Sequence, residues 1–372
     1  MSALDGDVYI GTPGFEAALA AELGSAPART LAAGVLATAA QPAPVDPTFA
    51  RQRLPDAREV AGASVRALAE AAFAAVEGAI DRWPGPFALH AFAPPPPPED
   101  DAPTGARAAH TRALAAKREG ARPAHAATDA GLASRAALVG RELLALLGER
   151  RKRASRRLVD APAAFDAGTL LVQLLLVERE RLVVSAAAPR ALPRGGLDLA
   201  PWPGGAAPVA DDRAPPSRAY RKLEEAFQWM AAAPRAGETC VDLGAAPGSW
   251  TLMAARRGAA VLAVDRSPLA PIVARAPGVT AIVGNAFTYE PPRPVDWLLC
   301  DVVCEPARAI ALVEAWLPRA RHLVVTVKFK GRDQYGALAA LEPIFARASP
   351  GYARVKHLAS NKNEVTVMVR RA

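Results

Sequence analysis

Short apolar runs alternate with longer amphipathic stretches from residue 206 to the end of the sequence. Runs of five or six mostly apolar residues predict buried strands, and apolar residues that recur every three or four positions predict helices. We expect strands at 239–243, 260–264, 279–283, 295–300, 322–327, 353–358 and 364–369, and helices at 217–230, 249–257, 269–274, 306–317 and 334–346. Strands that alternate with helices predict a mostly parallel sheet covered on both faces. The last two strands have no helix between them, which indicates an antiparallel hairpin at one edge.

The first 205 residues show a weaker pattern. It predicts a strand at 7–10, helices at 14–23, 61–80 and 132–147, and a hairpin of two apolar runs, 170–177 and 181–185, around a charged turn. Two proline-rich stretches, 93–103 and 187–216, are typical of linkers. For a chain of 372 residues we therefore predict two domains: an α+β region over residues 1–205 and an α/β domain over residues 206–372.

The composition is that of a water-soluble protein, with 51% apolar and 22% charged residues. No apolar run approaches the ~20 residues of a membrane-spanning helix, and the first residues lack the basic and then apolar pattern of a secretion signal. We expect a cytoplasmic protein with no membrane partner. Cys240, Cys300 and Cys304 are too few for a disulfide framework, and no nearby histidine completes a zinc site. We expect reduced thiols and no metal.

The net charge of +8 is unevenly distributed. Residues 1–205 carry 23 basic and 22 acidic side chains, and residues 206–372 carry 22 and 15. An excess of positive charge suits a polyanion such as nucleic acid, although many basic proteins bind none. The N-terminal half also contains a local cluster from Arg150 to Arg157, with six basic residues in eight. It is interpreted either as a solvated helix end or as a contact for RNA phosphates.

A glycine-containing loop, VDLGAAPGSW from Val241 to Trp250, follows the first predicted strand of the second domain. Glycine allows a sharp turn and close approach of a ligand, and the next helix begins with free N–H groups. The spacing fits neither a dinucleotide-binding fingerprint nor a phosphate-binding Walker loop. Asp265 ends the second strand about twenty residues later, where a carboxylate accepts both hydroxyls of a ribose. Asn285 ends the third strand, within reach of an adenine edge; for both residues the alternative is a turn.

The loop from Asp242 to Trp250, together with Asp265 and Asp301, resembles the S-adenosylmethionine site of the FtsJ-like RNA 2′-O-methyltransferases. The resemblance covers nearly all of residues 206–372 and implies a Rossmann-like, S-adenosylmethionine-dependent methyltransferase domain. The cofactor-binding residues that it implies are Gly244, Ala246, Pro247, Gly248, Ser249, Trp250, Asp265, Asn285 and Asp301. The sequence departs from the family pattern in that Ser249 replaces a glycine, Asn285 an acid and Ala219 a hydroxyl residue.

Methylation of a ribose hydroxyl needs a proton acceptor and a site that aligns oxygen, methyl and sulfur. A lysine accepts that proton only when neighbouring charge or burial lowers its pKa from ~10.4. Lys222, Asp301, Lys328 and Glu364 are expected to meet, because the carboxyl ends of parallel strands share one edge and an antiparallel last strand begins there. Their order is also that of the Lys–Asp–Lys–Glu tetrad of the resembled family. We expect Lys328 to be the proton acceptor.

Further segments resemble the RlmM family of bacterial 23S ribosomal RNA 2′-O-ribose methyltransferases. They are the stretches 11–23, 214–227, 301–307 and 364–371. This resemblance implies an N-terminal RNA-binding region with a THUMP module and a cytidine in large-subunit ribosomal RNA as the target. The cluster from Arg150 to Arg157 and the basic catalytic crevice would then contact that RNA.

Three alternatives remain open from the sequence. In the first, Lys330 rather than Lys328 is the lysine that takes part in the reaction. The second is a cytosine-C5 RNA methyltransferase with Cys304 as its nucleophile, although the stretch Asp301 to Cys304 lacks the proline of that family and no cysteine follows the next strand. The third is a noncatalytic RNA-binding or ribosome-assembly protein that keeps the fold, which would have no need of four charged residues in this arrangement.

Overall fold

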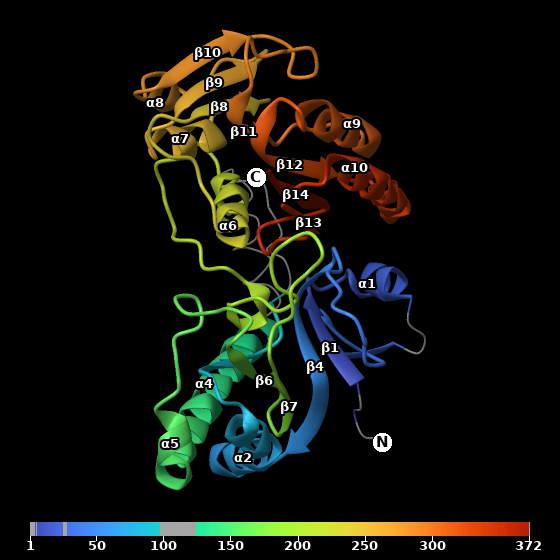
Figure 1. Cartoon of the computed structure of the whole chain (residues 1–372), viewed down its shortest axis with the longest axis vertical. Helices are drawn as coiled ribbons and strands as arrows, with labels where there is room; N and C mark the ends of the chain where they lie inside the picture. The colour runs from blue at the N-terminus through green and yellow to red at the C-terminus, as the bar shows by residue number, and fades with distance from the viewer. Residues whose placement is uncertain (1–3, 5, 25–27, 97–123, 372) are drawn as a thin grey trace, which may run out of the picture. The chain divides into compact units, whose positions relative to one another are not determined.

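Two seven-stranded sheets organise the chain in the computed structural model, which describes residues 4, 6–24, 28–96 and 124–371 (Figure 1). Each sheet forms the centre of one compact unit. The N-terminal unit comprises Met1–Val45, Gln52–Arg190 and Leu197–Gly205, and the C-terminal unit comprises Asp46–Arg51, Ala191–Gly196 and Ala206–Ala372. The main division thus lies at 205/206, and two short stretches from the N-terminal half of the sequence fold with the C-terminal unit.

The sheet of the C-terminal unit has the order β10-β9-β8-β11-β12-β14-β13. Its strands are β8 (Thr239–Leu243), β9 (Ala260–Asp265), β10 (Val279–Val283), β11 (Val295–Cys300), β12 (Ala320–Lys328), β13 (Tyr352–Lys356) and β14 (Glu364–Arg370). The first five strands in this order are parallel, and β14 is antiparallel to both β12 and β13. The predicted mostly parallel sheet with an antiparallel hairpin at one edge is confirmed.

The helices of this unit are α6 (Tyr220–Met230), α7 (Ser249–Ala255), α8 (Pro271–Ala274), α9 (Pro306–Trp316) and α10 (Leu341–Ala348). The single helix expected at 334–346 is instead a 3-10 segment, Arg332–Ala340, followed by α10. Pro343 explains the break, because a residue without an N–H is tolerated in the first turn of a helix and cannot donate to the carbonyl four residues earlier.

The N-terminal unit is an α+β layer with the strand order β2-β3-β1-β4-β7-β6-β5. Its elements are β1 (Gly6–Gly11), α1 (Glu16–Leu23), β2 (Arg29–Ala32), β3 (Val35–Thr38), β4 (Ala50–Ala61), α2 (Val65–Arg82), β5 (Phe87–Phe92), α4 (Ala124–Arg150), α5 (Lys152–Ser155), β6 (Leu170–Glu178) and β7 (Arg181–Ala187). Helices α2 and α4 lie side by side and share a core with β5, β6 and β7 (Figure 1). The predicted α+β class is confirmed, whereas β2 to β5 had no clear pattern in the sequence.

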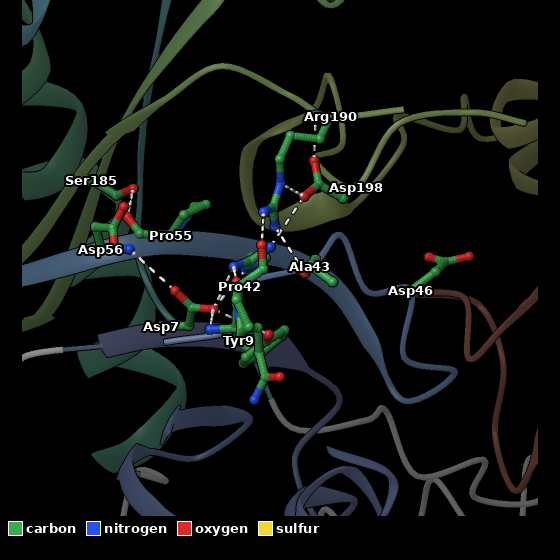
Figure 2. A network of polar contacts seen from close by, with 12 residues as sticks. Asp7, Tyr9, Pro42, Ala43, Asp46, Pro55, Asp56, Ser185, Arg190 and Asp198 are labelled. Carbon is green, nitrogen blue, oxygen red and sulfur yellow. Dashed lines mark hydrogen bonds and ion pairs between the residues drawn. The ribbon is translucent and has the colours of Figure 1, made fainter. Parts of the chain in front are cut away.

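A buried ion network explains why β4 has no apolar alternation. The guanidinium of Arg53 lies 2.6 Å from Asp7 and 3.1 Å from Asp198, and all three side chains are at most 4% exposed. Arg190 adds a 3.0 Å ion pair to Asp198 and donates to the carbonyls of Pro42 and Ala43 (Figure 2). Buried charges are tolerated when each is paired and hydrogen-bonded, so polar residues occupy core positions here.

No helix in the described part of the chain is long and apolar enough to cross a membrane. The three cysteines form no disulfide.

Candidate active site

Four charged side chains meet at the carboxyl edge of the second sheet. Lys328 ends β12 and is the register partner of Glu364, the first residue of β14. Asp301 follows the last residue of β11, and Lys222 reaches the same edge from α6. Because β14 is antiparallel, its start lies where the parallel strands end, so residues far apart in sequence converge as the topology predicts.

The distances show one continuous cluster of ion pairs. Lys222 Nζ lies 2.7 and 2.9 Å from the two carboxylate oxygens of Asp301 and 3.0 Å from Glu364 Oε1. Lys328 Nζ lies 2.9 Å from Asp301 Oδ1, 2.8 Å from the carbonyl oxygen of Asp301 and 3.9 Å from Glu364 Oε2. Both lysines therefore share one oxygen of Asp301, and two positive charges face two negative charges.

The two lysines differ in enclosure. The Lys222 side chain is 10% exposed and that of Lys328 is 21% exposed. Burial by itself would lower the pKa of Lys222, but the carboxylates of Asp301 and Glu364 outweigh it and raise this pKa above its ordinary value. Burial would likewise raise the pKa of Asp301, and the two lysines reverse that effect and lower it. Lys222 therefore stays protonated and Asp301 ionised.

Thr326 and Asn361 support this cluster and were not predicted from the sequence. Thr326 Oγ1 donates to Asp301 Oδ1 at 2.7 Å. Asn361 lies in the turn before β14, where its Oδ1 accepts from the backbone of Leu358 at 2.8 Å and from Thr366 at 3.2 Å. The position of Thr326, opposite the end of β11, was the one available signal, since a hydroxyl in an otherwise apolar strand needs a partner when buried.

The glycine-containing loop after β8 has the backbone that its sequence predicts. Gly244 and Gly248 have positive φ angles of 72° and 111°. A Cβ atom on Gly244 would lie 2.2 Å from Val302, and one on Gly248 would lie 2.7 Å from Val273. Side chains other than hydrogen are excluded at both positions by conformation and by space.

The predicted cofactor residues divide into two groups. Asp265 remains half-buried at the end of β9, where it accepts backbone N–H groups of Ala246 at 3.0 Å and Ser267 at 2.8 Å. A carboxylate offers about four acceptor positions, so two are left for the hydroxyls of a ribose. The side chains of Ser249 and Trp250, by contrast, are buried and tie the loop to the segment before α6, through Ser217 and the carbonyl of Ala219.

Asn285 begins a turn after β10. Its Oδ1 accepts from the backbone of Phe287 at 3.1 Å, and its carbonyl accepts from Thr288 and Tyr289. The turn interpretation therefore describes the geometry of this residue. Asp242, next to the loop, is a further buried acid; burial raises its pKa to about 7, although it accepts a hydrogen bond from Thr251 at 2.6 Å.

The structure argues against two of the alternatives that the sequence left open, Lys330 as the reacting lysine and Cys304 as a nucleophile. Lys330 is 81% exposed and pairs with Glu305 on the surface, so it lies outside the cluster of Lys222, Asp301, Lys328 and Glu364. Burial raises the pKa of the Cys304 thiol, which opposes formation of the thiolate that a nucleophilic cysteine needs. Among the described residues, no group of three or more His, Cys, Asp or Glu side chains could hold a metal ion.

The basic cluster of the N-terminal unit is partly structural. Arg151 pairs with Glu77 at 2.6 Å and Asp81 at 3.0 Å. Arg157 donates to carbonyl oxygens in the last turn of α2 and in the segment that follows it. Arg150 pairs with Glu70 at 3.6 Å, and the remaining exposed cations are Lys152, Arg153 and Arg156. Half of the cluster thus holds the unit together, and the other half faces solvent.

The family model of the FtsJ-like methyltransferases matches residues 215–339. The protein named ribosomal RNA large subunit methyltransferase M from Laribacter hongkongensis is 38% identical over 219 residues, 55% of this chain and 60% of its own. Its namesake from Pseudomonas syringae pv. syringae is 38% identical over 185 residues, 46% of this chain and 51% of its own. This chain thus matches only about half to three fifths of the length of these relatives.

A solved structure of 1,6-didemethyltoxoflavin-N1-methyltransferase from Burkholderia thailandensis matches 42% of this chain and 80% of its own at 18% identity, with a TM-score of 0.31. A superposition this loose adds nothing to the assignment.

Proposed function

We propose, from the match of residues 215–339 to the family model of the FtsJ-like methyltransferases, that the chain transfers a methyl group to a ribose 2′-hydroxyl of large-subunit ribosomal RNA. Enzymes of this family are S-adenosylmethionine-dependent. The observation that carries the proposal is the cluster of Lys222, Asp301, Lys328 and Glu364 beside the glycine-containing loop. It offers a fixed proton acceptor at the sheet edge where ligands of this fold bind.

S-adenosylmethionine fits the residues at this edge. Its nucleoside would lie against Asp265, whose carboxylate keeps two acceptor positions, and its amino-acid part along the loop from Gly244 to Gly248. Ser249 and Trp250 would act by holding this loop in shape, and Asn285 by shaping the turn beside the adenine. When bound, the cofactor supplies an electrophilic methyl group on a sulfonium sulfur.

Lys328 takes the proton of the 2′-hydroxyl in this proposal. Lys222 is more enclosed and contacts both carboxylates, so it keeps its proton and fixes Asp301 and Glu364 in place. Lys328 is more accessible and has one close carboxylate oxygen. Its nitrogen accepts the proton as the hydroxyl oxygen bonds to the methyl carbon, and the bond from that carbon to the cofactor's sulfur would break. General-base catalysis of this kind contributes about 10²–10⁴-fold.

The substrate part of the proposal has two supports. The matched relatives are named as large-subunit ribosomal RNA methyltransferases, and Lys152, Arg153 and Arg156 present exposed charge for RNA phosphates. In this proposal residues 1–205 form a THUMP-like RNA-binding region, residues 206–372 transfer the methyl group, the target is a cytidine of 23S ribosomal RNA, and the reaction takes place in the cytoplasm.

The test is transfer of tritiated methyl from S-adenosylmethionine to large-subunit ribosomal RNA that lacks natural methylation. Alkali cleaves RNA except where the 2′-oxygen is methylated, so label in alkali-resistant dinucleotides supports the proposal and their composition identifies the nucleotide. Small-subunit RNA serves as the control substrate. Label on a base, or RNA binding without transfer, would refute ribose methylation.

A further inference from the structure

Residues Asp46–Arg51 belong to the C-terminal unit although they come from the N-terminal half of the sequence. Asp46 pairs with Arg354 at 2.8 Å and with Lys356 at 2.5 Å. Lys356 Nζ also donates to the carbonyls of Pro47 at 2.7 Å and Ala50 at 3.0 Å. Arg354 and Lys356 are at most 6% exposed, so these bonds are formed away from water and hold the segment firmly.

Phe49 is the one aromatic side chain of this segment and is 4% exposed. Its ring centroid lies 4.9 Å from that of Tyr335, whose ring in turn lies 4.9 Å from Phe329 in an edge-to-face arrangement. Such aromatic pairs stabilise a fold beyond the apolar area that they bury. Phe49 thus joins Phe329 and Tyr335, two neighbouring residues from the other half of the sequence, in one stack of three aromatic rings.

The far end of this stack adjoins the site. Phe329 follows Lys328, and Asn363 precedes Glu364. Tyr335 donates to Asn363 Oδ1 at 2.8 Å, Asn363 Nδ2 donates to the carbonyl of Phe329 at 2.8 Å, and the Phe329 N–H donates to the carbonyl of Asn363 at 2.9 Å. These bonds extend the β12–β14 ladder by one rung beyond the Lys328–Glu364 pair.

We propose that Phe49 is a positioning residue for the methyl-transfer site: through Tyr335 it holds Phe329 and Asn363, and with them the Lys328–Glu364 rung. The inference rests on the proposed function for the role of that rung, and on the contacts alone for the coupling. A proton acceptor displaced by about 1 Å costs up to 10²-fold in rate. Removal of the Phe49 ring leaves Tyr335 without its support on one side, and the rung loosens.

The experiment compares the full-length variants Phe49→Ala and Phe345→Ala. Phe345 is a matched control, since it lies in α10 of the same unit and is also 4% exposed, and it has no part in the stack. We expect Phe49→Ala to lower kcat roughly tenfold to a hundredfold, with the KM for S-adenosylmethionine nearly unchanged. Phe345→Ala should lower stability and leave kcat within about twofold. Equal losses of kcat in the two variants would overturn the proposal.

Amide hydrogen exchange gives a readout that does not depend on methyl transfer. Phe49→Ala should accelerate exchange of the Phe329 amide at least tenfold, and Phe345→Ala should not. Unchanged exchange at Phe329 would overturn the coupling even if activity falls. If the wild-type protein methylates no ribose, the proposed function fails while the exchange result still decides the coupling.

Milder variants keep the test decisive if Phe49→Ala does not fold. Phe49→Leu retains much of the buried volume and should keep most of kcat. Tyr335→Phe removes the hydroxyl that donates to Asn363 and keeps both ring contacts, so it should give a partial loss of kcat with faster exchange at Phe329. Wild-type kcat and exchange in Tyr335→Phe would contradict the proposed route through Asn363.

Discussion

Both carboxylate oxygens of Asp301 lie within 2.9 Å of Lys222 Nζ. Lys222→Met keeps the length of the side chain and removes its charge, so Asp301 and Glu364 would be left buried beside only Lys328. Removal of one partner from a buried ion pair costs about 3–5 kcal/mol, and we expect the free energy of unfolding to fall by that order. Denaturant unfolding measures it. A loss under ~1 kcal/mol would contradict the view that Lys222 fixes the cluster.

Lys328→Met tests the chemical step. We expect methyl transfer to fall by about 10²–10⁴-fold, because the other lysine of the cluster, Lys222, stays protonated and cannot take over as the base. The dissociation constant for S-adenosylmethionine, measured by calorimetry, should change less than threefold. Lys330→Met is the matched control, since Lys330 is exposed and pairs with Glu305 outside the cluster. Near wild-type turnover in Lys328→Met would exclude Lys328 as the base.

Gly244→Ala tests the cofactor loop. The new Cβ would lie 2.2 Å from Val302 on a backbone with φ of 72°, so both the loop and the residue after Asp301 must shift. We expect affinity for S-adenosylmethionine to fall at least tenfold. Gly237→Ala is the control, because φ is 86° there and nothing lies within 4 Å; it should cost only ~1–2 kcal/mol of stability. Equal cofactor affinity in the two variants would refute the role of the loop.

Replacement of the exposed cations of the basic cluster tests whether this cluster binds RNA. Replacement of Lys152, Arg153 and Arg156 by alanine should weaken RNA binding and reduce the slope of log affinity against log salt by about 2–3, because each phosphate that is no longer neutralised lowers the slope by nearly one. The control removes three other exposed arginines of the same unit, Arg58, Arg82 and Arg141. Filter binding over a series of salt concentrations measures both slopes. Equal slopes in the two variants would remove the cluster from the RNA interface.

Buried histidines predict the acid sensitivity of the fold. Burial lowers the pKa of His357 and of His90 to about 4. Between pH 6.5 and 4, each of these histidines binds a proton in the unfolded chain but not in the folded chain. The free energy of unfolding is therefore highest with respect to these two groups above pH 6.5, and it falls as the pH is lowered. The slope is about 1.4 kcal/mol per pH unit for each histidine. Denaturant unfolding at about pH 7.5 and pH 5 measures it, and His357→Gln should flatten the profile.

The architecture of the C-terminal unit could be predicted because most of its strands are buried on both faces and read as apolar runs; the edge strand β10 is an apolar run that stays largely exposed. The bounds of β8, β10 and β11 match the sequence pattern residue for residue. The convergence of Lys328 and Glu364 also followed from topology, since an antiparallel last strand must begin where β12 ends. The pattern of apolar residues and the direction of each strand were sufficient for both.

The remaining features depend on contacts between residues far apart in the chain, which produce no periodic pattern in the sequence. Strand β4 was missed because Arg51, Gln52 and Arg53 occupy buried positions, and their partners lie far away in sequence. The segment around Phe49 could not be assigned to the C-terminal unit, since nothing local indicates which sheet a short polar stretch joins. The inward direction of Ser249 and Trp250 is likewise set by the segment before α6.

The ion pair between Asp46 and Arg354 spans 308 positions of sequence. At a synthesis rate of about 5–20 residues per second, Asp46 leaves the ribosome roughly 15–60 s before its partner exists. The C-terminal unit therefore cannot be completed during most of translation, because its segment Asp46–Arg51 is made long before the sheet of that unit. A chain expressed from residue 206 onward would lack that segment altogether, so the C-terminal unit cannot be cut out intact at its main boundary.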